Sequence, residues 1–165
     1  PGNYDHIYQS DLCGWVGQLG YNKDSAYGAN VYTTSQEEEL VAAGFYATGK
    51  DSQYELYVVR NFENADSLTQ RIPVASGKLS NAGYYTVDFN QAISLDAGER
   101  YAVVLYIITP GSVHPMAIEY AADEATENVD LDDGESYISA NGSKWVSVDT
   151  VEKSNLCIKA FSDNR

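Results

Sequence analysis

The segment YAVVLYII, residues 101–108, decides the fold class. Its side chains are apolar or aromatic on both alternating faces, from Tyr101 to Ile108. A half-buried strand alternates apolar and polar residues, whereas an apolar run of this length is typical of a strand that is covered on both sides. We therefore expect residues 101–108 to form the central strand of a sheet.

Two further runs alternate with the same period of two. Residues 54–59 (YELYVV) and 84–89 (YYTVDF) are rich in β-branched and aromatic residues, which favour strands. In the second run, alternation places Tyr84, Thr86 and Asp88 on one face, opposite an apolar face. We expect the Tyr84 face to be the wetter of the two and able to contact a ligand.

Short strands of this kind recur along the whole chain. The others are expected at 29–33, 40–48, 116–120, 136–139, 144–148 and 156–161. Turn residues separate them, and Asn141-Gly142 is a strong hairpin signal because both residues tolerate positive φ. Residues 35–40 indicate a turn or a single helical turn, and 121–128 a loop or short helix. About ten short strands predict one all-β domain over residues 1–165, a two-sheet antiparallel β-sandwich.

Composition limits the partners of this domain. The chain has 165 residues and a net charge of −14, which repels nucleic acid and anionic lipid surfaces. No apolar run approaches the length of a membrane-spanning helix, so we expect no membrane insertion. Tyrosine is frequent, with 14 residues, and serves both strand packing and ligand contact.

Catalysis is not indicated by the nucleophiles and bases of the chain. A cysteine nucleophile needs a base within hydrogen-bond reach, and the available groups are Cys13, Cys157, His6 and His114. Neither cysteine has the sequence setting of a papain-type nucleophile. With 24 acidic residues, chance pairs of carboxylates carry no information about glycoside cleavage. We expect a non-catalytic chain.

The two cysteines lie near opposite ends of the chain. Because domain termini are often close in space, Cys13 and Cys157 could form a disulfide that closes nearly the whole chain. Two buried thiols are the alternative, since free cysteine is among the most buried residue types. Sequence leaves both open.

An acidic turn suggests calcium. Asp130, Asp132, Asp133 and Glu135 surround a glycine, and closely spaced carboxylates supply the oxygen ligands that calcium prefers. The spacing is not that of an EF-hand loop. A solvated acidic turn before the strand at 136–139 is the alternative, and Asp5, Asp11 and Asp24 are other oxygen donors.

Glycan binding would require exposed aromatic rings next to amides and carboxylates. The aromatic residues considered for this role are Trp15, Tyr21, Tyr27, Tyr32, Tyr84 and Trp145. Each of these rings could equally belong to the core, and sequence does not separate the two roles.

The order of several short strings resembles a known family. The strings are Gly14-Trp15, Leu19-Gly20-Tyr21, Ala29-Asn30-Val31-Tyr32-Thr33, Glu39-Leu40-Val41-Ala42-Ala43-Gly44-Phe45-Tyr46, Gly83-Tyr84-Tyr85-Thr86-Val87-Asp88, Ser94-Leu95-Asp96-Ala97-Gly98-Glu99 and Asn155-Leu156-Cys157-Ile158-Lys159-Ala160-Phe161. Together they resemble the lectin-like domain associated with papain-type cysteine peptidases on Firmicutes cell surfaces, from about Tyr4 to Phe161. The resemblance implies an extracellular β-sandwich of the jelly-roll or carbohydrate-binding-module kind, with a neighbouring peptidase domain. It also implies calcium, which some family members are thought to hold.

These observations give one leading hypothesis and two alternatives. Both ends of the chain read as linkers, so we expect a module excised from a larger secreted or cell-surface bacterial protein. The leading hypothesis is an accessory module that positions a cysteine peptidase on a glycan, a cell wall or a protein substrate. The alternatives are a structural spacer that packs against the peptidase, or a carbohydrate-binding module of a glycan-degrading enzyme.

Overall fold

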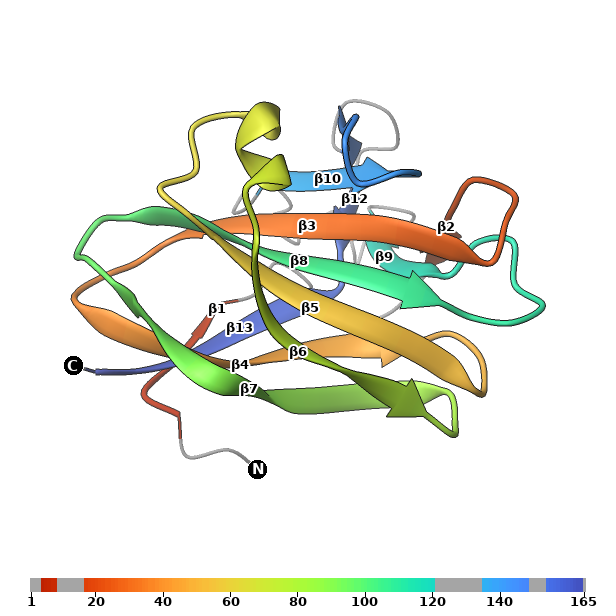
Figure 1. Ribbon diagram of the computed structural model, residues 1–165, viewed down its shortest axis with the longest axis horizontal. Coiled ribbons are helices and arrows are strands. Elements are labelled where there is room, and N and C mark those ends of the chain that lie inside the picture. Colours follow the sequence, from red (N-terminus) through yellow and green to blue (C-terminus); the bar gives the residue numbers. More distant parts are fainter. Residues whose placement is uncertain (1–3, 9–16, 121–134, 149–153, 165) are drawn as a thin grey trace.

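Strands make up most of the computed structural model, which describes residues 4–8, 17–120, 135–148 and 154–164. Within these residues it has thirteen strands and one short 3-10 helix (Figure 1). The strands are β1 (His6–Tyr8), β2 (Gly17–Leu19), β3 (Ser25–Thr33), β4 (Glu38–Ala47), β5 (Ser52–Arg60), β6 (Ile72–Leu79), β7 (Gly83–Leu95), β8 (Arg100–Ile108), β9 (Met116–Tyr120), β10 (Glu135–Ser139), β11 (Val146–Ser147), β12 (Ser154–Leu156) and β13 (Ile158–Asn164), and the helix is η1 (Ala65–Thr69).

Two antiparallel sheets form the sandwich. One has four strands in the order β1-β13-β4-β7, and the other has six in the order β11-β10-β3-β8-β5-β6. The chain crosses repeatedly between them, since β3, β5 and β8 lie in the six-stranded sheet and β4 and β7 in the four-stranded sheet. The prediction of an all-β antiparallel sandwich is confirmed.

A third, three-stranded sheet, β12-β9-β2, was not expected. It arises because the predicted strand at 156–161 is divided: Leu156 pairs with β9, whereas Ile158 pairs with β4. The buried Asn30 side chain holds this division, because its Nδ2 donates to the carbonyls of Leu156 (2.8 Å) and Ile158 (3.0 Å). A buried amide that is satisfied in this way fixes the chain path, and a period-two pattern does not reveal it.

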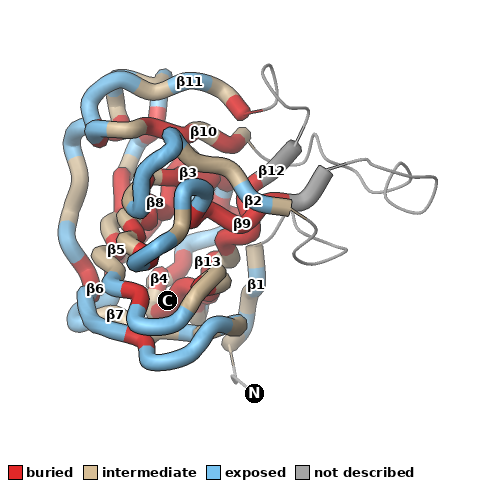
Figure 2. The backbone as a smooth tube through the Cα atoms, turned by 90° about the vertical axis from the view of Figure 1, so that its right-hand side faces the viewer, coloured by how far each residue is buried: buried red, intermediate tan, exposed pale blue. Residues whose placement is uncertain are grey.

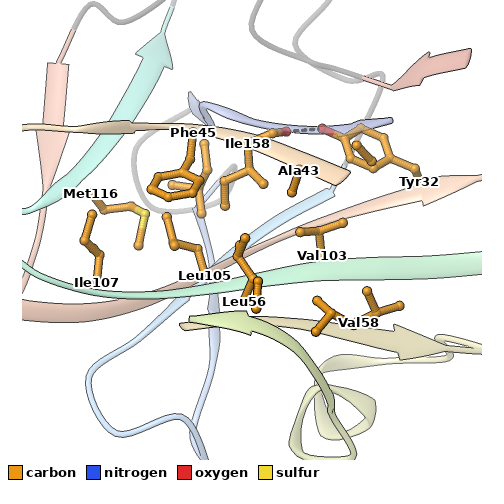
Figure 3. Packing of buried hydrophobic residues seen from close by; sticks show 14 of the residues in the cluster. Tyr32, Ala43, Phe45, Leu56, Val58, Val103, Leu105, Ile107, Met116 and Ile158 are labelled. Atoms are coloured by element: carbon orange, nitrogen blue, oxygen red, sulfur yellow. Dashed lines mark hydrogen bonds between the residues drawn. The ribbon is translucent and has the colours of Figure 1, made fainter. Parts of the chain in front are cut away.

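The main core fills the space between the two large sheets. Leu56 of β5 and Leu105 of β8 face Phe45 of β4 and Ile158 of β13 (Figure 3). The Tyr32 hydroxyl extends from the six-stranded sheet and donates to the Ile158 carbonyl at 2.6 Å. This bond joins the two layers inside the core.

The central strand is covered on both sides, as predicted. Ala102 and Val104 belong to a second apolar cluster on the outer side of the six-stranded sheet, under Phe62 and Leu68. Phe62 belongs to the β5–β6 connection and Leu68 to η1. The two strands at the middle of this sheet, β3 and β8, are mostly buried (Figure 2). The connection therefore covers one half of this outer face and leaves the other half open.

Two buried carboxylates hold strand ends and corners in place. Glu38 accepts hydrogen bonds from the hydroxyls of Tyr8 and Ser162, both at 2.6 Å, which ties β4 to β1 and β13. Glu99 accepts two hydrogen bonds from the Arg60 guanidinium, at 2.8 and 3.0 Å. Both side chains are almost fully buried, and each is satisfied by several donors.

Several local predictions need correction. Residues 72–79 form a strand that the sequence did not suggest, because Pro73 and Gly77 interrupt the apolar pattern; both are tolerated on an edge strand such as β6. The strand expected at 144–148 is limited to β11. Residues 35–37 form a bend rather than a helical turn. The hairpin at Asn141-Gly142 is confirmed, but its loop is longer than two residues.

Candidate ligand-binding face

The open half of the outer face of the six-stranded sheet carries the candidate site. Strand register places Tyr27 of β3 opposite Tyr106 of β8, Tyr106 opposite Glu55 of β5, and Glu55 opposite Ser76 of β6. A second row, from Ile108 through Gln53 to Lys78, lies beside the first, since directly paired residues share a face. The site therefore stands on rigid strand positions.

These two rows surround a shallow hollow of about 230 Å³. The residues that line it are Gln53, Tyr54, Glu55, Ser76, Gly77, Tyr106 and Ile108. The set combines two aromatic residues, a carboxylate, an amide and a serine hydroxyl. This is the chemistry that sugar recognition needs, because the apolar face of a pyranose packs on a ring while polar groups bond its hydroxyls.

Glu55 is fixed from one side. The Tyr57 hydroxyl donates to Glu55 Oε1, and burial together with this hydrogen bond raises the pKa of Tyr57 to about 12. The phenol thus stays protonated and keeps donating at neutral pH. Glu55 Oε2 has no hydrogen bond with any part of the chain that the structure describes, and Glu55 lines the hollow.

We call the β5–β6 connection with η1, together with the β10–β11 loop, the cover of this sheet. Arg71 joins the cover to the sheet beside the hollow. Its guanidinium carbon lies 5.2 Å from the Tyr27 ring centre and 5.1 Å from that of Tyr57. Nη1 donates to the carbonyls of Leu68 (2.9 Å) and Gly142 (2.8 Å). One side chain therefore connects η1, the β10–β11 loop and the aromatic rings of the sheet.

Of the predicted ligand aromatics, Tyr27 and Trp145 are brought together. Their ring centres are 6.1 Å apart in an edge-on arrangement, and both rings are half-buried against the second apolar cluster. Gly142 lies so close to Tyr27 that a Cβ at this position would stand 2.8 Å from the ring. Tyr27 therefore lies beside the hollow, whereas Tyr54 and Tyr106 are the aromatic residues that line it.

The remaining predicted aromatics lie elsewhere. Tyr84, 38% exposed, is on the outer face of the four-stranded sheet, and its wetter face is confirmed by the exposure of Tyr84, Thr86 and Asp88. Tyr21 is exposed in the turn after β2. Tyr32 is a buried core residue, which is one of the two roles that the sequence left open for it. Trp15 lies outside the described residues.

Sequence reasoning missed Tyr106, Glu55 and Gln53. Tyr106 belongs to the apolar run that decides the fold, and it therefore reads as a core residue. The signal that could have found the site is the strand register: once β5 and β8 are paired, the outward residues of both fall into the same rows. Single-strand alternation gives the face of each residue but not its neighbours.

The predicted metal ligands are only partly described. Asp130, Asp132 and Asp133 lie outside the described residues. Glu135 is in β10, where it pairs with Arg100 and accepts a hydrogen bond from the Tyr137 hydroxyl at 2.8 Å. No group of three acidic, histidine or cysteine side chains suited to a metal gathers within the ranges that the structure describes. Calcium at this turn stays a prediction.

The cysteine prediction also stays open. Cys157 is buried at the division between β12 and β13, with its backbone N–H donating to the Ala117 carbonyl at 3.1 Å. Cys13 lies outside the described residues. Of the two histidines, His114 is exposed in the β8–β9 loop, and His6 Nε2 is 2.7 Å from Asn164 Oδ1.

Two solved structures share this fold across the whole chain. A clostridial cysteine protease, Cwp84 after propeptide cleavage, superposes with a TM-score of 0.80 at 24% identity, covering 100% of this chain and 41% of that one. The cysteine protease and lectin-like domains of Cwp84, a surface layer associated protein of Clostridium difficile, superpose with a TM-score of 0.75 at 24% identity, covering 100% and 37%. This chain thus spans about two fifths of the length of those proteins.

A match to a family model agrees with the structural comparison, although no curated protein matches the chain. Within its described residues, no helix is long and apolar enough to cross a membrane. The family model described as "Lectin like domain" matches residues 7–162, which is nearly the whole chain. This match confirms the resemblance seen in the sequence, and the chain belongs to the family of lectin-like domains.

Proposed function

We propose that this domain is the accessory module of a secreted or cell-surface cysteine peptidase and that it binds glycans weakly at the hollow around Tyr106. The hollow carries the proposal, because it places an aromatic ring beside a carboxylate, an amide and a hydroxyl on rigid strands. Its volume of about 230 Å³ is below the roughly 300–1,000 Å³ of sites for drug-sized ligands. We therefore expect contact with one or two sugar units and an affinity between micromolar and millimolar.

The peptidase part of the proposal draws on the solved relatives. In the Cwp84 structure, a cysteine protease domain and a lectin-like domain occur in one protein that is associated with a surface layer. A binding module in the same chain raises the local concentration of its enzyme at the surface that it recognises. A cell-wall glycan would serve as such an anchor.

A glycan array followed by titration of each hit tests the binding. Tyr106→Ala should weaken binding by roughly tenfold, since it removes the ring on which the sugar packs. Tyr84→Ala is the matched control, because it removes an exposed tyrosine from the opposite sheet. Equal loss in both variants would contradict the site, and no hit with the folded, calcium-loaded domain would contradict glycan binding.

A spacer role is the second candidate, and it is supported by the outer face of the four-stranded sheet. Ile7 of β1 is 56% exposed and pairs in register with Phe161 of β13. A neighbouring domain packed on this face would remove that apolar side chain from water. Ile7→Ser should then lower the unfolding midpoint of the peptidase-containing protein and leave that of the isolated domain unchanged.

Calcium is proposed as a structural ion at the acidic turn of Asp130, Asp132, Asp133 and Glu135. Its support is the clustering of carboxylates in the sequence. An ion that binds the folded state alone raises the unfolding midpoint. The midpoint in calcium should therefore exceed the midpoint in chelator, and equal midpoints would remove the ion from the proposal.

A further inference from the structure

The charge of the hollow suggests which glycans it selects. Glu55 is the one charged residue among the seven that line it, and the others are neutral. Glu55 Oε1 is occupied by the Tyr57 hydroxyl, whereas Oε2 accepts no hydrogen bond from the described residues. Across the strand pair from Glu55 lies the ring of Tyr106. A carboxylate beside an aromatic ring is suited to a cationic group, which both of them attract.

We infer that the hollow prefers glycans with free, positively charged amino groups over their N-acetylated counterparts. This inference rests on the proposed glycan binding at the same site. An ammonium group bonded to Glu55 Oε2 would lie near the Tyr106 ring, while the neighbouring pyranose packs on that ring. The net charge of −14 acts in the same direction, because it attracts cationic ligands and repels acidic ones.

Lys78 is the basic residue nearest to this arrangement in the strand register. It is exposed at the rim, opposite Gln53, and no ion pair joins it to Glu55. Its ammonium would repel a cationic sugar slightly. Lys78 therefore provides a variant whose effect has the opposite sign to that of Glu55.

The test compares a glucosamine hexamer with an N-acetylglucosamine hexamer by calorimetric titration against the 165-residue domain. The two probes differ only in the acetyl groups. The glucosamine hexamer should bind about fivefold to tenfold more tightly at low salt, as expected for one charged hydrogen bond. Glu55→Gln should reduce this ratio to near one, and Lys78→Gln should leave it unchanged or raise it.

Non-specific attraction to an acidic protein is controlled by Glu63→Gln. Glu63 is exposed beyond the far end of β5, so this variant removes the same charge away from the hollow. If Glu63→Gln lowers the ratio as much as Glu55→Gln does, the inference is overturned. Equal affinity for both hexamers also overturns it and leaves glycan binding intact. Failure of both hexamers and of every array glycan to bind would overturn glycan binding itself.

Discussion

The two outer faces of the sandwich both pair an aromatic ring with a glycine, but in opposite ways. On the six-stranded sheet, Gly142 belongs to a loop that presses down on Tyr27. On the four-stranded sheet, Gly44 is part of strand β4, and Tyr84 lies over it from the adjacent strand. The first ring is held under a cover, and the second is exposed. Of the two rings, Tyr27 is packed between the sheet and the loop, so we expect it to be held more rigidly than Tyr84.

Replacing each glycine by alanine is the strongest test of this comparison. Gly142 has φ of 78°, and its new Cβ would stand 2.8 Å from the half-buried Tyr27 ring. We expect Gly142→Ala to lower the free energy of unfolding by about 2–4 kcal/mol through backbone strain and overpacking. Gly44→Ala should cost less than about 1 kcal/mol, because the far end of an exposed tyrosine can move away. Urea unfolding measures both, and equal costs would contradict the distinction.

Strand alternation in the sequence predicts only part of this difference between the covered and the exposed outer face. The central strand at 101–108 and the wet face of Tyr84 follow from alternation alone, and the structure confirms both. The cover does not follow from it. Phe62 and Leu68 lie in a connection without any period, and their packing depends on long-range contacts with Val104. Local patterns describe strands better than they describe the loops that cover them.

The second test concerns the cation on each face. Arg71 contacts two rings and two backbone carbonyls, whereas Lys159 contacts the exposed Tyr84 ring at 5.1 Å. Arg71→Ala should cost about 2–3 kcal/mol of unfolding free energy, and Lys159→Ala about 0.5 kcal/mol. Arg71→Lys should recover only part of the loss, since an ammonium cannot reproduce the planar guanidinium contacts. Full recovery would show that charge alone holds the cover.

Sequence patterns likewise predict only part of the candidate site. The sequence predicted Tyr27 and Trp145 as aromatic ligand contacts, and the structure brings the two rings together. Neither ring lines the hollow around Tyr106, and their role as ligand contacts stays a prediction. Glu55 and Tyr106 belong to separate runs that read as ordinary strands. They become neighbours through pairing between residues 51 positions apart, and no local signal encodes that pairing.

Acid should distinguish the carboxylates that support the two sheets. Burial would raise the pKa of Glu38, but hydrogen bonds from Ser162, Tyr8 and the Gln36 N–H outweigh it and lower the pKa. Burial of Glu99 is likewise outweighed by Arg60 and by backbone donors, so its pKa is lowered too. A lowered folded-state pKa gives stability that is present above the ordinary value of 4.5 and lost as pH falls below it.

We therefore expect the free energy of unfolding to fall by about 1–2 kcal/mol per carboxylate on acidification. Urea unfolding at a series of pH values from neutral downward measures this loss. Salt separates the two groups. High salt should weaken the contribution of Glu99, whose main partner is the charged Arg60, more than that of Glu38, whose hydrogen-bonded partners are neutral. A Glu99→Gln variant with undiminished acid sensitivity and salt dependence would contradict this assignment.

The smallest expected effect lies between the two faces, at Tyr101. Its hydroxyl is the one buried side-chain polar atom of the described residues that has no hydrogen-bond partner, and burial raises its pKa well above 10. Tyr101→Phe removes a desolvated group without changing the ring, so it should stabilise the fold by up to about 1 kcal/mol at neutral pH. Above pH 10 the phenol of Tyr101 ionises in the unfolded chain but resists ionisation when buried, which favours unfolding; the variant lacks this contribution. The stability gap should therefore widen as pH rises. A variant that is less stable than the wild type at neutral pH would mean that the hydroxyl has a hydrogen-bond partner, such as a bound water, and would contradict this prediction.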